Sequence, residues 1–264
     1  MIRIPKRVAV KVGSNVLTRA DGKLDVTRMS AIVDQIAELR KRGIEVLLIT
    51  SGAVASGRGE LPSLQNDGVA ERQLYAAVGQ AKLIEHYYEL FKKHGIIVGQ
   101  ILTSRENFEK NCLLINQKRC MTAMLDNGVV PIINENDALA IKELMFTDND
   151  ELSGLVAKMM RVKALIILSN VDGVFTGDPE NSDSELIRKV YTDDDFSYYI
   201  GNRKSEFGRG GMGTKMKTAQ KVAKGGIIVY IANGKKSDIL LDLLFQPEKC
   251  DFTLFLSNKK PKAK

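Results

Sequence analysis

The fold is decided near the N-terminus by residues 8–15, which read VAVKVGSN and form an apolar run that ends in a turn cluster. A run without regular polar alternation is typical of a strand that is buried on both faces of a parallel sheet. A helical pattern follows, for which Asp25 or Thr27 is expected to be the N-cap and Gly43 the C-terminal glycine. Residues 44–49 form a second apolar run, so a strand–helix–strand unit is predicted here.

The same alternation of short apolar runs and longer helical patterns continues along the chain. It predicts an α/β fold in one continuous domain, with a mostly parallel sheet and helices on both faces. In such sheets ligands bind beyond the carboxyl ends of the strands, so the loops after these ends are expected to carry the chemistry. Residues 173–213 are less regular and are expected to hold a hairpin and a mobile loop. The further strands are predicted at 96–102, 129–133, 164–168 and 227–232, and the helices at about 69–94, 113–126, 150–161 and 215–224.

The composition excludes several classes of protein. Hydrophobic residues make up 44% and charged residues 27% of the 264 residues, which is typical of a soluble globular protein. The three cysteines form no C-x-x-C pair, which fits a reducing compartment, and no apolar run approaches the roughly 18 residues of a membrane span. The N-terminus has no apolar signal-peptide region, so a cytoplasmic location is expected. The only histidines, His86 and His94, fall on one predicted helix, and no metal site is expected from them.

The formal net charge of +7 raises the question of an acidic partner. Part of the excess comes from four lysines in residues 257–264, which are expected to be a solvated tail. The chain has no tryptophan and no basic stripe with interleaved aromatic residues on which bases could stack. Nucleic acid is therefore not expected to be a partner.

Two of the loops have an unusual content of small residues. The first contains Lys11 and Gly13, where an ammonium and accessible backbone N–H groups could meet phosphate oxygens. A surface lysine followed by a plain turn is the alternative. The second loop, residues 50–57, reads TSGAVASG and offers a backbone surface to a small polar ligand. Close packing of a helix on the sheet explains the same residues equally well.

Carboxylates and amides gather after the strand at 129–133, in residues 134–137 (NEND) and 147–150 (TDND). Asn149 has both donors and acceptors and suits the two ends of an amino acid, while Asp137 could pair with an ammonium group. Asp150 stands at the start of a predicted helix, where a role as helix cap is the alternative.

A glycine-rich segment, residues 208–215 (GRGGMGTK), leads into the predicted helix that starts at Lys215. Glycines next to a helix N-terminus suit phosphate binding, although a flexible linker is the alternative. Neither the Walker A pattern nor a G-x-G-x-x-G fingerprint after the first strand occurs in the chain. Two lysines and one aspartate at loop–element junctions, Lys11, Asp150 and Lys215, point to phosphoryl transfer, in which Mg²⁺ bridges nucleotide phosphates.

Seven segments together resemble one known family. They read VKVGS, TSGAVASG, AAVGQ, PIINEND, DND, VDGVF and GGMGTK and begin at residues 10, 50, 76, 131, 148, 171 and 210. In this order, and over about residues 8–255, the chain resembles the amino acid kinase superfamily, especially those members that phosphorylate the side-chain carboxylate of L-glutamate. The resemblance implies a three-layer αβα sandwich over residues 1–256. Its amino-acid-binding part would cover about 1–160 and its nucleotide-binding part about 161–256.

The resemblance also implies the roles of individual residues. Lys11 and Lys215 would stabilise the transferred phosphoryl group, and Asp150 would orient these two lysines. ATP and Mg²⁺ would be required, and no protein residue is expected to be a metal ligand. The glutamate site would consist of Ser51, Gly52, Asn134, Asp137 and Asn149, and the nucleotide site of Lys11, Gly13, Ser169, Asn170, Arg209, Gly210, Gly211, Met212, Gly213, Thr214 and Lys215.

The wider implications concern the pathway and the assembly. The product would be L-glutamate 5-phosphate, in the first step of proline biosynthesis, with proline as a feedback inhibitor and a homodimer or homotetramer as the assembly. Ser169-Asn170 stands where the family usually has Thr-Asp, and the C-terminal PUA domain of many members is expected to be absent.

Three alternatives remain open. The first is a sister kinase that acts on N-acetylglutamate, aspartate, carbamate or a nucleoside monophosphate. The second is a non-catalytic sensor of nucleotide or amino acid. The third is a module that binds nucleic acid.

Overall fold

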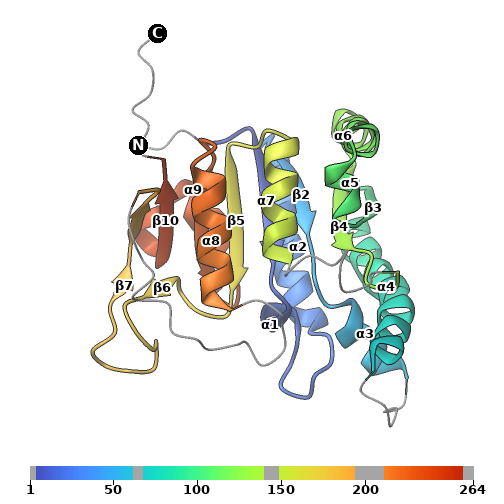
Figure 1. Ribbon diagram of the computed structural model, residues 1–264, viewed down its shortest axis with the longest axis horizontal. Helices are drawn as coiled ribbons and strands as arrows, with labels where there is room; N and C mark the ends of the chain where they lie inside the picture. The colour runs from blue at the N-terminus through green and yellow to red at the C-terminus, as the bar shows by residue number, and fades with distance from the viewer. Residues whose placement is uncertain (1–3, 62–67, 140–148, 194–210, 258–264) are drawn as a thin grey trace.

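The computed structural model describes residues 4–61, 68–139, 149–193 and 211–257, and within them one large sheet forms the centre (Figure 1). Its strands pair in the order β3-β4-β2-β1-β5-β9-β10-β8. Among these neighbours only β9 and β10 run antiparallel, so the prediction of a mostly parallel sheet is confirmed. The strands are β1 (Arg7–Val12), β2 (Glu45–Ile49), β3 (Val98–Thr103), β4 (Val130–Glu135), β5 (Ala164–Ser169), β8 (Lys189–Tyr191), β9 (Ile228–Asn233) and β10 (Phe252–Leu256).

Helices cover both faces of this sheet, as the alternating pattern predicts. Along β1 the side chains of Val8 and Val10 belong to one hydrophobic cluster and that of Ala9 to the other, because successive residues of a strand point to opposite faces. Each cluster is a separate core, and the three layers are visible in Figure 1. The first core contains residues of α2 (Val26–Lys41), α4 (Val69–Lys92) and α9 (Ile239–Phe245), and the second those of α6 (Asn111–Asp126), α7 (Asn149–Met159) and α8 (Met212–Ala223).

The small residues after β2 allow two helices to pack closely, which the sequence alone does not show. Residues 50–52 are the loop, and α3 (Ala53–Glu60) follows directly and packs on α4. A Cβ atom on Gly79 of α4 would lie 1.8 Å from the carbonyl oxygen of Ala53, and one on Gly57 would lie 2.0 Å from that of Tyr75. The two helices therefore touch backbone to backbone, and glycine is required at both positions. The packing is of helix on helix rather than of helix on sheet.

The ends of α2 lie where the capping residues in the sequence predict them. Asp25 rather than Thr27 caps α2, because its Oδ1 accepts a hydrogen bond of 2.9 Å from the backbone N–H of Arg28. Gly43 adopts a φ of +76°, the left-handed conformation that a C-terminal glycine supplies. The last of the predicted helices, α8, starts at Met212 instead of Lys215, so Lys215 lies within its first turn.

The irregular region after β5 contains the expected hairpin, because β6 (Val174–Phe175) pairs antiparallel with β7 (Leu186–Ile187). The mobile loop was expected within residues 173–213, of which residues 194–210 lie outside the described residues. Residues 258–264 of the lysine-rich tail also lie outside them. No helix in the described part of the chain is long and apolar enough to cross a membrane. The remaining short elements are α1 (Ser14–Leu17), α5 (Glu106–Glu109) and a 3-10 turn at Pro247–Lys249.

Candidate active site

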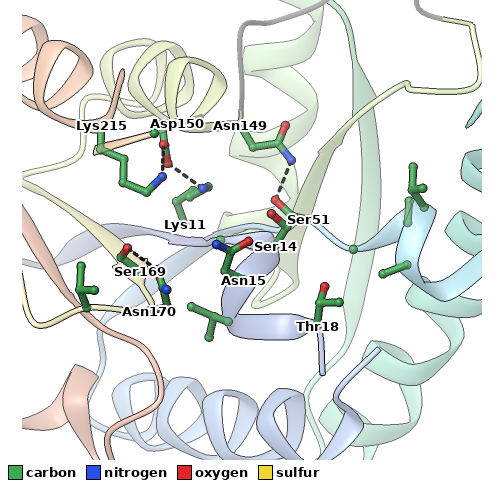
Figure 2. A pocket seen from close by; sticks show the side chains of 18 of the residues that line it. Lys11, Ser14, Asn15, Thr18, Ser51, Asn149, Asp150, Ser169, Asn170 and Lys215 are labelled. Atoms are coloured by element: carbon green, nitrogen blue, oxygen red, sulfur yellow. Dashed lines mark hydrogen bonds and ion pairs between the residues drawn. The ribbon is translucent and has the colours of Figure 1, made fainter. Parts of the chain in front are cut away.

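A cavity of about 910 Å³ opens beyond the carboxyl ends of the central strands (Figure 2). The loops after β1, β2, β4 and β5 line it, together with the first turns of α7 and α8. This is the edge of the sheet at which the parallel topology predicts a ligand site. The walls mix backbone, amide, hydroxyl and charged groups, so the cavity suits a polar and charged ligand.

The most buried charged group of the cavity is the carboxylate of Asp150, in the first turn of α7. Its Oδ1 lies 2.6 Å from Nζ of Lys11, which comes from β1. Its Oδ2 lies 3.1 Å from Nζ of Lys215, which comes from α8. Three elements that are far apart in the sequence thus bring one anion and two cations together, as Figure 2 shows. The interpretation of Asp150 as only a helix cap is wrong, because both of its oxygens engage lysines.

The two lysines decide the charge of Asp150. Burial by itself raises the pKa of this carboxyl group, but the nearby ammonium groups of Lys11 and Lys215 outweigh burial and lower the pKa from 3.8 to about 2. The group is therefore ionised at neutral pH. One carboxylate between two ammonium groups leaves a net positive charge, so the site attracts an anion such as a phosphate.

An amide network of Ser51, Asn134 and Asn149 forms the other side of the cavity. The Nδ2 group of Asn149 donates hydrogen bonds to the backbone oxygen of Thr50 at 2.8 Å, to Oγ of Ser51 at 3.0 Å and to Oδ1 of Asn134 at 3.0 Å. Figure 2 shows the bond from Asn149 to Ser51. Because all three residues line the cavity, these bonds hold a defined set of polar groups against a ligand.

Helix α4 supports this network from behind. Oε1 of Gln80 accepts a hydrogen bond of 2.8 Å from Nδ2 of Asn134. The hydroxyl of the fully buried Tyr87 lies 2.8 Å from Oγ1 of Thr50. Since Thr50 donates its own hydroxyl proton to the backbone oxygen of Ser51, Tyr87 is the donor in this pair. Burial raises the pKa of Tyr87 above its ordinary value, so the hydroxyl keeps its proton.

The predicted nucleotide residues lie at the side of the cavity next to β5. Gly13 approaches β5 closely: its N–H donates to the backbone oxygen of Leu168 at 3.1 Å. Oγ of Ser169 donates a long hydrogen bond of 3.4 Å to Oδ1 of Asn170. The predicted residues that line this side are Lys11, Gly13, Ser169, Asn170, Gly211, Met212 and Lys215; Gly213 and Thr214 lie in the first turn of α8, and Arg209 and Gly210 fall outside the described residues.

The predicted amino-acid residues all line the cavity as well, namely Ser51, Gly52, Asn134, Asp137 and Asn149. Several cavity residues had no assigned role in the sequence. Ser14 and Asn15 directly follow Gly13, so their place in the same loop was a usable signal. Arg58 and Arg72, from α3 and α4, had no signal in the sequence, because only the packing of these helices directs them to the cavity.

The described residues contain no group of three or more histidine, cysteine or acidic side chains that could hold a metal ion by itself. Both oxygens of Asp150 already face lysines. A Mg²⁺ ion at this site would therefore depend on oxygens brought by a nucleotide, which is a normal arrangement for this ion.

The sequence was compared with known protein families and with individual proteins, and both comparisons indicate the same family. The profile described as "Amino acid kinase family" matches residues 6–233. A protein named glutamate 5-kinase from Bacteroides thetaiotaomicron is 61% identical over 251 residues, which are 95% of this chain and 70% of that protein. The glutamate 5-kinases of Chlorobaculum tepidum and Clostridium acetobutylicum are 49% and 39% identical over 89% and 96% of this chain. The chain spans 65% of the length of the first of these two and 96% of the second.

Solved structures share the fold at low sequence identity. The UMP kinase from Bacillus anthracis has a TM-score of 0.67 at 19% identity, over 97% of this chain and 98% of that one. Carbamate kinase from Giardia lamblia bound to AMP-PNP has a TM-score of 0.68 at 15% identity, over 96% of this chain and 99% of that one. These likenesses confirm the three-layer architecture. With the profile match and the identity to curated relatives, the chain belongs to the amino acid kinase family, and within it to the glutamate 5-kinases.

Proposed function

We propose that the protein transfers the γ-phosphoryl group of ATP to the side-chain carboxylate of L-glutamate. A carboxylate oxygen forms the new bond to phosphorus, the bond from phosphorus to the oxygen that bridges to the β-phosphate breaks, and ADP leaves with that electron pair. The product is L-glutamate 5-phosphate, which serves proline biosynthesis. The observation that carries the proposal is the buried carboxylate of Asp150, which holds two lysine ammonium groups at the edge of the cavity.

The charges of the site fit this reaction. In the transition state the moving phosphoryl group spreads negative charge over its oxygens, and cations fixed beforehand stabilise that charge. Lys11 and Lys215 supply two such cations, and Asp150 fixes both at once. The substrate carboxylate is already ionised at neutral pH and attacks directly, so no general base is required. Mg²⁺, when bound with the nucleotide, would bridge its phosphates and reduce their charge.

The amino-acid side of the cavity fits free glutamate. The carboxylate of Asp137 lines the cavity and would attract the α-ammonium group of the substrate. Asn149 offers its Oδ1 and Ser51 its hydroxyl proton, in an arrangement fixed by their mutual hydrogen bond, for the remaining groups. An acetylated amine carries no charge and gains less from an acidic partner, which favours glutamate over N-acetylglutamate.

The nucleotide side is proposed to consist of the loop at Gly13, the pair Ser169-Asn170 and the start of α8. Residues 209–215 would supply backbone N–H groups and Lys215 to the phosphates, as helix N-termini commonly do. The pair Ser169-Asn170 keeps the hydroxyl of the family's usual Thr-Asp pair but has an amide in place of the carboxylate.

The assembly, its regulation and its location are further parts of the proposal. A homodimer or homotetramer is proposed because the resemblance to the family implies it. Inhibition by proline is proposed because the resemblance implies it. The free thiols of Cys112, Cys120 and Cys250 support a reducing location such as the cytoplasm.

The test is formation of a hydroxamate from the acyl phosphate, in the presence of ATP, Mg²⁺ and hydroxylamine. Glutamate, N-acetylglutamate and aspartate are compared in parallel. Signal with glutamate alone supports the proposal. Signal with another acid moves the protein to a sister activity with the same mechanism. Tight ATP binding by folded protein, with no signal from any of the acids, favours a sensor.

A further inference from the structure

We propose that Gln80 is a positioning residue for the amino acid substrate: it fixes the orientation of Asn134 and, through Asn149, the direction in which the Ser51 hydroxyl donates. The inference rests on the proposed glutamate site. Gln80 lies behind Asn134 and is not one of the residues that line the cavity. Its effect on the substrate must therefore pass through other side chains.

The contact of α3 with α4 brings Gln80 to this place. Gly79, the preceding residue, lies against the backbone of Ala53, so α4 approaches the loop after β2 more closely than any side chain at Gly79 would permit. The next residue, Gln80, then reaches Asn134 at the end of β4. Leu83 and Tyr87 follow at helical spacing and are fully buried, so this face of α4 is anchored.

The hydrogen bonds of the Asn134 side chain fix which end of its amide is the oxygen and which is the nitrogen. A backbone N–H can only donate, so the bond of 2.9 Å from N of Glu135 identifies its partner on Asn134 as the oxygen Oδ1. The other end of this amide, Nδ2, must then point to an acceptor, and Gln80 supplies it at 2.8 Å. Asn134 is 2% exposed, so solvent does not readily replace this acceptor.

The same reasoning extends to Asn149 and Ser51. A backbone oxygen can only accept, so the bond to the oxygen of Thr50 identifies the group on Asn149 as Nδ2. That group also donates to Oδ1 of Asn134 and to Oγ of Ser51. Ser51 therefore accepts from Asn149, and within the described ranges no acceptor takes the proton of its own hydroxyl. That proton is available to a carboxylate oxygen of the bound amino acid.

Loss of the acceptor at position 80 would disturb this order. The Nδ2 group of Asn134 would then be left unpaired in a buried place, and turning the amide would only direct that group at the N–H of Glu135 and at Nδ2 of Asn149. Donor would then face donor, and Asn149 and Ser51 would lose their fixed directions. The expected result is weaker binding of glutamate without damage to Lys11, Asp150 or Lys215.

The experiment compares Gln80→Leu, which has similar size but no acceptor, with Gln80→Glu, which keeps an oxygen at Oε1. Lys82→Leu is the matched control, because Lys82 lies on the same helix and makes an exposed ion pair with Glu85. In the hydroxamate assay Gln80→Leu is expected to raise KM for glutamate by about tenfold, as loss of one hydrogen bond does, with kcat and KM for ATP within about twofold. Gln80→Glu and Lys82→Leu are expected to stay within about threefold of the wild type.

A second readout does not depend on turnover. Hydrogen exchange of the Asn134 side-chain amide, followed by NMR, is expected to be slow in the wild type and in Gln80→Glu and at least about tenfold faster in Gln80→Leu. Equal exchange rates would overturn the role of Gln80, whichever substrate the enzyme uses. In an assay with an active wild type, an unchanged KM in Gln80→Leu, or an equal loss of kcat, would also overturn it. A wild type without any signal from glutamate would instead contradict the proposed function.

Discussion

Nζ of Lys215 lies 3.1 Å from Oδ2 of Asp150, while the other oxygen of the same carboxylate lies 2.6 Å from Nζ of Lys11. One side chain at the start of α7 therefore sets the positions of two cations that come from β1 and α8. The lysines would act on the moving phosphoryl group, so their loss is expected to lower turnover. The carboxylate holds the lysines, so its loss is expected to change the stability of the fold.

Lys215→Ala is expected to lower kcat by at least about 100-fold, because the lost cation acts mainly on the charge of the transition state. Binding of glutamate, measured by calorimetry, is expected to change by less than about threefold. Lys217→Ala is the control, since Lys217 lies on the same helix and is exposed. A variant at position 215 with a near-normal rate would remove Lys215 from the mechanism.

Asp150→Asn is expected to change how stability depends on pH. The folded-state pKa of Asp150 is lowered from 3.8 to about 2, so this group stabilises the fold above pH 3.8 and loses that effect as the pH falls toward 2. Over that pH window the unfolding free energy of the wild type should fall by about 2 kcal/mol more than that of the asparagine variant. Urea unfolding at a series of pH values measures the difference. Parallel curves for the two proteins would contradict it.

Asp137→Ala is expected to raise the glutamate concentration that half-saturates the enzyme by about 10- to 100-fold, the effect of losing a charged partner for the α-ammonium group. KM for ATP should stay close to the wild-type value. Steady-state kinetics with each substrate varied in turn gives both constants. Loss of ATP binding with intact glutamate binding would show that the two sides of the cavity have been exchanged.

Tyr87→Phe is expected to cost about 1 kcal/mol of stability, because it removes one buried hydrogen bond to Thr50 and keeps the packing of the ring. Tyr88→Phe is the matched control, as Tyr88 is the next residue and is 50% exposed. Chemical denaturation of both variants provides the comparison. Equal stabilities would mean that the hydroxyl of Tyr87 contributes nothing to the support of the loop after β2.

Gly79→Ala is expected to destabilise the protein by at least about 2 kcal/mol, because the new Cβ atom would lie 1.8 Å from the carbonyl oxygen of Ala53. In Gly59→Ala the new atom would meet nothing within 4 Å, so this change is expected to be neutral. Thermal unfolding separates the two. If both variants melted together, α3 and α4 would not be in backbone contact.

The sequence predicts the central part of the fold well because its signals there are local. The apolar runs of β2 and β5 are continuous, that of β1 is interrupted only by Lys11, and Asp25 and Gly43 mark the ends of α2. Lys11 and Asp150 stand directly at strand and helix ends, where topology brings them together. These features require no knowledge of which helix face meets which neighbour.

The support of the site could not be predicted in the same way. Gln80 and Tyr87 belong to a long amphipathic helix, and the sequence alone does not show where such a helix packs. Their roles follow only from the contact at Gly79, which is a relation between two helices. The small residues at 50–57 were open to two interpretations for the same reason. The elements β8, α9 and β10 had no predicted counterpart either, and β8 has only three residues.

The position of β1 has a consequence for the diversification of such proteins. Strands β2, β4 and β3 lie on one side of it and β5, β9, β10 and β8 on the other, so the loops proposed to hold the phosphate acceptor and those proposed to hold the nucleotide belong to opposite flanks of the sheet. On this division, laboratory evolution toward a new phosphate acceptor should concentrate on the loops after β2 and β4 and leave the loop after β5 unchanged.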